Sequence, residues 1–216
     1  MSWAQPLRDI SGLAKAVVVF SVLLTLVDVL SALTSFWADD AYERAFAEGR
    51  AATDVFTIHD AVNLLYVVLI PTWILGSLWL SRARANAAQL EPREVRRSPA
   101  WAWLGWLVPV VSLWFPKQIV DDSWRVAARA NRARSEAPHL TRPTESTTVW
   151  WALWLVYLFL SNILGRLAWQ ADDMTEFVVP WLEVAVAVTS VAALAAWIPV
   201  VRNVSREHRR LAGFAE

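Results

Sequence analysis

The sequence predicts an all-α integral membrane protein, with four transmembrane helices, a short Trp-rich re-entrant segment and a cytoplasmic amphipathic interfacial helix. Three observations support this fold class. Hydrophobic residues make up 56% of the 216 residues, above the roughly 45–50% of soluble proteins. They are concentrated in blocks of about 20 residues, the length of helix that crosses a bilayer. The basic residues gather in only some of the polar segments between those blocks. We expect residues 1–216 to form one membrane domain.

Four apolar blocks are long enough to cross the hydrocarbon core, which takes about 20 helical residues. Their few charged side chains are Asp28 in the first block, Arg166 near the end of the third and Glu183 near the start of the fourth. A soluble fold of this length has no need for four such blocks. The first block exceeds the roughly 7–15 apolar residues of a signal peptide, so we interpret it as a retained anchor. The predicted spans are residues 16–37, 61–81, 149–169 and 177–201.

A fifth apolar block, residues 100–115, differs from the other four. It contains four tryptophans, is interrupted by Pro109 and is closed by Pro116. As a helix it would extend only about 24 Å, which is short for a span. Basic segments flank it on both sides, so a crossing would place one of them outside. The sequence therefore predicts a re-entrant segment inside the helix bundle. A hairpin lying flat at the membrane interface is the alternative.

The distribution of basic residues predicts the orientation, because short cytoplasmic loops are enriched in Lys and Arg. Residues 82–99 carry five basic side chains, residues 117–146 carry six and the tail beyond residue 201 carries four. Residues 38–60 carry two basic and six acidic side chains, and residues 170–176 carry three acidic ones and no basic one. We therefore expect both termini to be cytoplasmic, with segments 38–60 and 170–176 outside.

Residues 117–135 have the pattern of an amphipathic helix, which we expect to lie on the inner leaflet. A solvated helix that covers the base of the bundle is the alternative. The apolar face is formed by Ile119, Val120, Ser123, Trp124, Ala127 and Ala128. The polar face is formed by Lys117, Asp121, Arg125, Arg129 and Arg132.

The composition excludes several kinds of chemistry. The chain has no cysteine, so thiolate catalysis, disulfides, iron–sulfur clusters and cysteine zinc sites are excluded. The net charge is zero, which argues against a nucleic-acid partner. The sequence contains no glycine-rich phosphate loop, no G-x-S-x-G turn and no H-E-x-x-H helix. We therefore predict no catalytic residue, no metal site and no cofactor, and favour a function that is not enzymatic. A membrane-embedded enzyme whose substrate enters at the Trp-rich block is the alternative.

Polar side chains near the outer ends of the predicted spans are the candidate binding site, because charged groups inside a membrane are costly and usually functional or paired. The functional interpretation is an outward-facing cavity for a small polar ligand, a proton or a lipid head group. The structural alternative is an ion pair that fixes helix register. Arg166 is expected within hydrogen-bond reach of Glu183 or Asp28. The predicted cluster consists of Asp28, Asp60, Asn63, Asn162, Arg166 and Glu183.

One stretch resembles a known family. It starts at Trp79-Leu-Ser-Arg-Ala-Arg-Ala-Asn-Ala87, continues at Arg97-Ser-Pro-Ala-Trp-Ala-Trp-Leu-Gly-Trp-Leu-Val-Pro109 and ends at Ser112-Leu-Trp-Phe-Pro116. The order and spacing resemble the bacterial, mainly actinobacterial, membrane family called domain of unknown function 4328. Ser112 and Lys117 depart from that family's usual asparagine and tyrosine. The motif residues are Arg84, Asn86, Ser98, Pro99, Trp106, Pro109, Trp114 and Pro116.

The resemblance implies a multi-span protein of the bacterial cytoplasmic membrane and implies no activity. Together with the missing catalytic motifs, it favours a non-enzymatic membrane module. Such a module would act on an unknown membrane protein, or would bind a small molecule or a lipid head group. Its surroundings are the lipid bilayer, and a homo-oligomer is compatible with the sequence. The alternative function is a small transporter or proton-coupled carrier that uses the Asp/Arg/Glu cluster.

Overall fold

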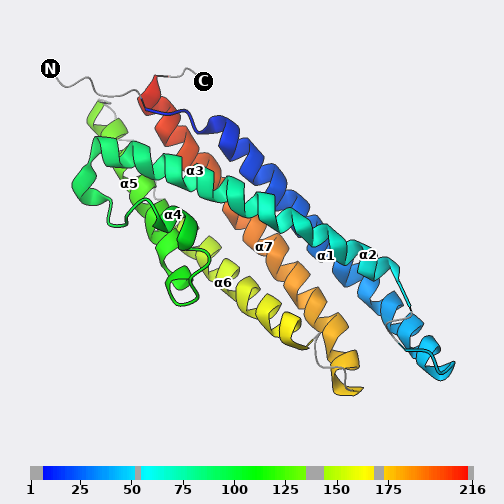
Figure 1. Ribbon diagram of the computed structural model, residues 1–216. Helices are drawn as coiled ribbons and strands as arrows, with labels where there is room; N and C mark the ends of the chain where they lie inside the picture. Colours follow the sequence, from blue (N-terminus) through cyan, green and yellow to red (C-terminus); the bar gives the residue numbers. More distant parts are fainter. Residues whose placement is uncertain (1–6, 52–54, 135–143, 168–172, 214–216) are drawn as a thin grey trace. The chain divides into compact units, whose positions relative to one another are not determined.

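The computed structural model describes residues 7–51, 55–134, 144–167 and 173–213. These residues form helices joined by turns, and no strand occurs among them. Figure 1 shows the helices coloured along the chain. The long elements are α1 (Ser11–Ala47), α3 (Leu69–Leu90), α5 (Phe115–Arg134), α6 (Thr144–Leu167) and α7 (Asp173–Ala212). The short ones are α2 (Ile58–Leu64), η2 (Leu65–Val68), η3 (Pro92–Glu94), α4 (Trp101–Leu104) and η4 (Val111–Leu113).

Four helices are long and apolar enough to cross a membrane: Ser11–Ala47, Ile58–Leu90, Thr147–Leu167 and Val178–Ala212. The first two contain the predicted spans 16–37 and 61–81, and the third and fourth include residues 149–167 and 178–201 of the other two. Residues 168 and 169 of the third predicted span lie outside the described residues, and the first, second and fourth helices extend well beyond the predicted spans. The segment 38–60, predicted as a loop, is therefore partly helical, because α1 continues to Ala47. Residues beyond the apolar stretches, rich in Ala, Arg and Glu, favour helix in water as well, so the helices do not end where the apolar residues end.

The helix from Ile58 to Leu90 changes its winding once. The 3₁₀ turn η2, Leu65–Val68, lies just before Pro71. Proline has no N–H for the carbonyl four residues earlier, here that of Val67, and its ring crowds that carbonyl. The tighter 3₁₀ turn accommodates this break in the α-helical bonding. Tyr66 lies within this turn, so the proline determines the local backbone that carries its side chain.

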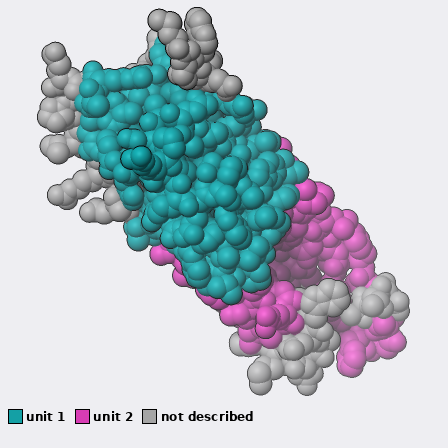
Figure 2. Space-filling model, turned by 60° about the vertical axis from the view of Figure 1, so that its left-hand side comes forward, with its two compact units in different colours: residues 1–19, 72–151, 195–216 teal, residues 20–71, 152–194 magenta. Residues whose placement is uncertain are grey.

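The chain divides into two compact units, coloured separately in Figure 2. Unit 1 consists of residues 1–19, 72–151 and 195–216, and unit 2 of residues 20–71 and 152–194. In unit 1 the core consists mainly of apolar side chains. Helix α3 buries Trp79 and Leu80, and α5 buries Ile119 and Val120, all at no more than 1% exposure.

Tryptophans join three helices within unit 1. The rings of Trp150 on α6 and Trp197 on α7 are stacked with centroids 4.3 Å apart. Trp79 on α3 meets Trp197 edge-on at 5.5 Å, and its indole N–H donates to the Ser205 hydroxyl at 3.0 Å. Aromatic pairs of these geometries stabilise a core beyond the area that they bury. The tryptophan content of the sequence therefore contributes to the core of unit 1 as well as to exposed positions.

The stretch predicted as an amphipathic helix lies within α5 up to Arg134, and most of the side chains assigned to its apolar face are buried within unit 1. Ile119, Val120, Ser123, Ala127 and Ala128 are all buried. Asp122 was not assigned to that face, yet it is 1% exposed. The residue is tolerated there because Arg96 binds its carboxylate, as described below.

Candidate functional site

The first half of the candidate site is built around Asp28, which is 2% exposed and lies on α1. Three hydroxyl groups from three other helical elements bind its carboxylate. Tyr66 donates at 3.0 Å, Tyr157 at 3.4 Å and Ser190 at 2.6 Å. The Ser190 hydroxyl also lies 3.1 Å from that of Thr25. Within the described part of the chain, the hydrogen-bond partners of this aspartate are neutral hydroxyl groups, and no Lys or Arg side chain pairs with it.

The second half is built around Glu183, which is 6% exposed and lies on α7. The Ser31 hydroxyl donates to Glu183 Oε2 at 3.0 Å, and it lies 3.1 Å from Oδ1 of Asn63. His59 Nε2 is 3.4 Å from Glu183 Oε1. The other ring nitrogen of His59 is 3.2 Å from the Thr34 hydroxyl. Among the residues that the structure describes, the side chain paired with this glutamate is thus a histidine, whose charge depends on protonation.

The two halves belong to one cluster. Asp28 and Ser31 are three residues apart on α1, which places them on the same face of the helix. Asn63, which lies 3.1 Å from the Ser31 hydroxyl, and Tyr66, which donates to Asp28, are also three residues apart in the chain. A single hydroxyl proton cannot serve two acceptors at once, so Ser31 and Ser190 can each change partner. We name this cluster the polar core of unit 2. Its members are Thr25, Asp28, Ser31, Thr34, His59, Asn63, Tyr66, Tyr157, Glu183 and Ser190.

Three residues of the predicted cluster lie in the polar core, namely Asp28, Asn63 and Glu183. Asp60 lies outside the polar core and completes a capping box with Thr57 at the start of α2. Its carboxylate accepts the Thr57 N–H at 2.7 Å and the Tyr42 hydroxyl at 3.0 Å. Asp60 therefore fixes the beginning of a helix.

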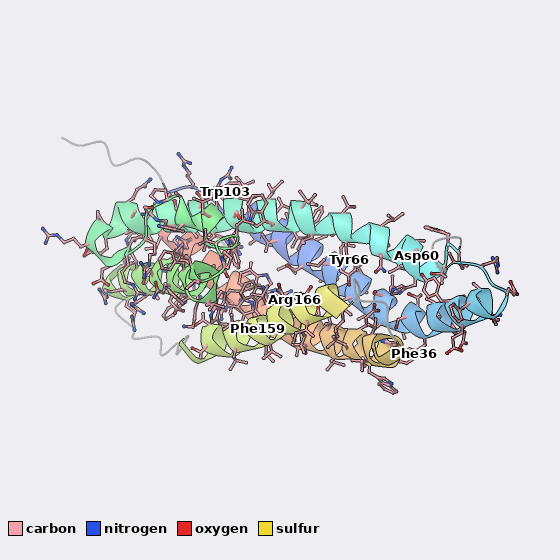
Figure 3. The ribbon with its side chains drawn as sticks, turned by 60° about the horizontal axis from the view of Figure 1, so that its bottom comes forward. Phe36, Asp60, Tyr66, Trp103, Phe159 and Arg166 are labelled. Atoms are coloured by element: carbon pink, nitrogen blue, oxygen red, sulfur yellow. The ribbon has the colours of Figure 1, made fainter. Side chains whose placement is uncertain are left out.

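The expected ion pair of Arg166 with Glu183 or Asp28 is wrong. Arg166 is exposed near the end of α6 (Figure 3), and neither carboxylate has it as a partner. The reason is helical phase. Arg166 follows Tyr157 by nine residues, two and a half turns at 3.6 residues per turn, so the two side chains leave opposite faces of α6. Asn162 is also exposed, and its amide donates to the Leu158 carbonyl of the same helix at 2.7 Å.

Sequence reasoning missed the hydroxyl groups of the polar core. A signal was available in the first span, where Thr25, Asp28 and Ser31 follow one another at intervals of three in an otherwise apolar segment. That spacing predicts one polar stripe on a helix. Tyr66 and Tyr157 gave no comparable signal, because a single tyrosine in an apolar span is equally compatible with a position at the membrane interface.

The family-motif residues lie in unit 1, where several of them hold backbone groups. The Asn86 side chain is fully buried. It accepts the Arg8 N–H at 2.9 Å and donates to the Arg8 carbonyl at 2.8 Å. Arg84 donates to the Arg97 carbonyl at 2.7 Å, and Trp106 to the Ala102 carbonyl at 3.1 Å. The hydroxyl of Ser112, the residue that departs from the family pattern, donates to the Pro109 carbonyl at 2.7 Å.

The turn that follows Arg97 starts at the Ser98-Pro99 pair. The Ser98 carbonyl accepts the N–H of Trp101 at 3.1 Å, and the Pro99 carbonyl accepts that of Ala102 at 3.2 Å. At the far end of the segment, the Trp114 carbonyl accepts the Gln118 N–H at 3.0 Å, while Pro116 is buried at the start of α5. The motif thus specifies the path of the backbone between α3 and α5.

A buried acid outside the motif residues completes this region. Asp122 accepts a hydrogen bond from the Arg96 guanidinium at 2.7 Å, and Arg125 lies 3.8 Å from it. These hydrogen bonds from Arg96 to Asp122 raise the pKa of the arginine. Arg97 places its guanidinium carbon 3.8 Å from the Phe115 ring centre, a cation–π contact.

Residues 43–206 match the family described as domain of unknown function (DUF4328). The chain belongs to this DUF4328 family. The match includes parts of both units and every motif residue on which the resemblance rested, whereas Asp28 and the other α1 members of the polar core precede it. No curated protein and no solved structure matches the chain. Among the described residues of this DUF4328 protein, no group of three or more His, Asp or Glu side chains is placed to hold a metal ion.

Proposed function

We propose that this chain is a non-enzymatic membrane module that binds a small cation in the polar core of unit 2. One observation carries the proposal: two buried carboxylates, Asp28 and Glu183, share a core in which no Lys or Arg side chain of the described residues pairs with them. A charged carboxylate removed from water without a counter-ion is strongly disfavoured, so it is protonated or neutralised. A bound cation provides that neutralisation.

The surrounding groups suit a cation better than an anion. Carboxylate, hydroxyl and amide oxygens converge in the core, and the cations of unit 2 are engaged elsewhere. Arg44 donates to the Asp40 carbonyl, Arg50 pairs with Glu48 at 2.7 Å, and Arg166 is exposed. An anionic or zwitterionic head group would find there only His59 as a basic partner among the described residues, and Glu183 already contacts it. The structural alternative is a core that only fixes helix register, with both acids protonated.

A proton-coupled carrier is the second candidate, and a specific observation favours it. Two short sets of hydrogen-bonding groups lie in this core: His59, Glu183 and Ser31 form one, and Tyr66, Asp28 and Ser190 form the other. Such chains of hydroxyl, carboxylate and imidazole groups occur in membrane proton relays. In the proton-coupled carrier, the cation enters the polar core as protons leave the carboxylates of Asp28 and Glu183. Both candidates use the same site, and they differ in whether protons cross the membrane.

The placement in the bilayer is part of the proposal. Both termini lie on the cytoplasmic side of a bacterial cell membrane, and segment 100–115 dips into the inner leaflet. Within unit 1, Arg84 on α3 binds the backbone at Arg97, while Trp103 meets Trp73 at 5.8 Å. Trp73 and Arg84 are about 16 Å apart along the helix axis. With Arg84 at the head groups, Trp103 reaches about the middle of a core 30 Å thick.

The test is cation-dependent stability in nanodiscs. Sodium, ammonium and tetramethylammonium chloride are added at constant ionic strength, and the unfolding midpoint and proton release are recorded. At least one cation should raise the midpoint and release protons; saturation at 100 times the dissociation constant adds about 2.7 kcal/mol. Asp28→Asn and Glu183→Gln should abolish the response, and Glu43→Gln, an exposed position on α1, should keep it. A response that survives Asp28→Asn combined with Glu183→Gln would contradict the proposal.

The carrier candidate has a separate readout. In proteoliposomes with an enclosed pH indicator, an inward gradient of the responsive cation should move protons outward, and Asp28→Asn should stop this movement. Cation binding without proton movement would support the binding module and contradict the carrier.

A further inference from the structure

The segment between α3 and α4 lies along α5 in a regular order. Arg97 donates to the Gln118 side chain at 2.8 Å. Arg96 binds Asp122 at 2.7 Å, and Glu94 accepts from Arg129 at 3.0 Å. As the chain runs backward from residue 97 to 94, its partners advance along α5 from 118 to 129. The segment is therefore held against the helix over about three turns.

These contacts leave a surplus of positive charge at one surface. Residues 82–134 contain ten basic and four acidic side chains. Asp122, 1% exposed, is occupied by Arg96. Arg125, Arg129 and Arg132 follow at helical spacing on one face of α5, and Arg93 precedes the Glu94 that meets Arg129. We name Arg93, Arg125, Arg129 and Arg132 the basic face of unit 1.

The apolar side chains of the neighbouring segment are exposed. Leu107 is 59% and Val110 64% exposed, and Leu104 and Trp114 are also exposed. The opposite side of this segment is fixed to unit 1. Ala102 and Ser112 are buried, and the Trp151 indole donates to the Leu113 carbonyl at 2.9 Å. The exposed apolar side chains are therefore held in place as a surface, which needs an apolar covering.

We infer that unit 1 binds anionic phospholipids, with head-group phosphates on the basic face and acyl chains against the exposed side chains of segment 104–114. An anionic phospholipid carries both required chemistries in one molecule. Its phosphate matches guanidinium groups, and its chains match Leu107 and Val110. A nucleic acid or an acidic peptide would satisfy the charges and leave the apolar surface bare. This inference uses the proposed placement of segment 100–115 and does not depend on cation binding in unit 2.

The first test compares lipid retention by the full chain. Protein in a mild detergent is mixed with equal amounts of phosphatidylglycerol and phosphatidylcholine, and the lipids retained are counted by native mass spectrometry. The wild type should retain phosphatidylglycerol preferentially. The variant Arg93→Gln/Arg125→Gln/Arg132→Gln, which keeps the Arg96–Asp122 pair, should lose about tenfold or more of that preference. The control Arg44→Gln/Arg50→Gln removes two exposed charges from unit 2 and should leave it unchanged. Equal preference in the triple variant and the wild type would overturn the inference.

A second test addresses the apolar part. The chain has no cysteine, so a single Val110→Cys carries one spin label. In phosphatidylglycerol-containing vesicles, that label should be accessible to oxygen and shielded from a water-soluble nickel reagent. A label at Glu91→Cys, an exposed position near the basic face, should show the reverse. A water-accessible label at Val110 would overturn the acyl-chain contact, whatever the result of the cation test.

Discussion

Unit 1 and unit 2 differ in the balance of apolar and polar side chains that they bury, although unit 1 also buries Asn86 and Asp122. Unit 1 buries large apolar side chains such as Trp79 and Leu80, and its sequence contains 17 basic and nine acidic residues. Unit 2 buries the polar side chains Asp28, Ser31 and Glu183, and contains three basic and 11 acidic residues. The zero net charge of the chain conceals this unequal distribution of charge between the units. The exposed positions of unit 2 include many large apolar side chains.

This difference indicates which interactions stabilise each unit. Large aromatic side chains such as the tryptophans of unit 1 stabilise a core through close packing. Helices that face lipid gain little from apolar burial, because the acyl chains are as apolar as the side chains, and polar contacts and close packing join them instead. We therefore expect stability to depend on apolar volume in unit 1 and on hydrogen bonds in unit 2. The free energy of unfolding, measured by SDS titration in mixed micelles, tests this expectation.

The largest effect is expected at Trp79. This side chain is 1% exposed, meets Trp197 edge-on and donates to Ser205. Trp79→Ala should lower the free energy of unfolding by about 3–5 kcal/mol, since it leaves a cavity and an unpaired hydroxyl. Trp37→Ala, at a position of unit 2 that is 64% exposed, should cost far less. Equal losses at the two positions would mean that the two units do not differ in this way.

The second effect concerns ion pairs. Arg96 and the buried Asp122 should show a coupling free energy of about 2 kcal/mol in a double-mutant cycle of Arg96→Gln and Asp122→Asn. The value stays moderate because the arginine side chain is 48% exposed. The matched pair in unit 2 is Arg50–Glu48, whose side chains are 51% and 61% exposed. Its coupling should be about 0–0.5 kcal/mol. A coupling below 0.5 kcal/mol for Arg96 and Asp122 would show that the buried acid does not organise unit 1.

The helices could be predicted from the sequence because length and hydropathy determine them directly. Their ends could not, since helix propensity continues into residues such as Asp40 and Arg206 after the apolar stretch stops. The carboxylates of the polar core were recognisable because charge is rare in a span. Their partners depended on helical phase and on the 3₁₀ turn at Tyr66, which follow from packing and from Pro71. Predicting Arg166 inside the bundle failed because depth along a helix says nothing about which face a residue occupies.

The smallest effect is expected at Arg166. This position tests whether the depth of a residue along a helix, or the helix face that it occupies, determines its contribution. Arg166→Leu should change the free energy of unfolding by no more than about 0.5 kcal/mol, as at other exposed positions. Tyr157→Phe is the matched change on the same helix. It removes only the hydroxyl that donates to Asp28 and should cost about 1 kcal/mol. Cation binding should persist in Arg166→Leu and weaken in Tyr157→Phe, because only the tyrosine touches the polar core. A loss of about 3 kcal/mol or more in Arg166→Leu would instead indicate a buried ion pair, and would return Arg166 to the site.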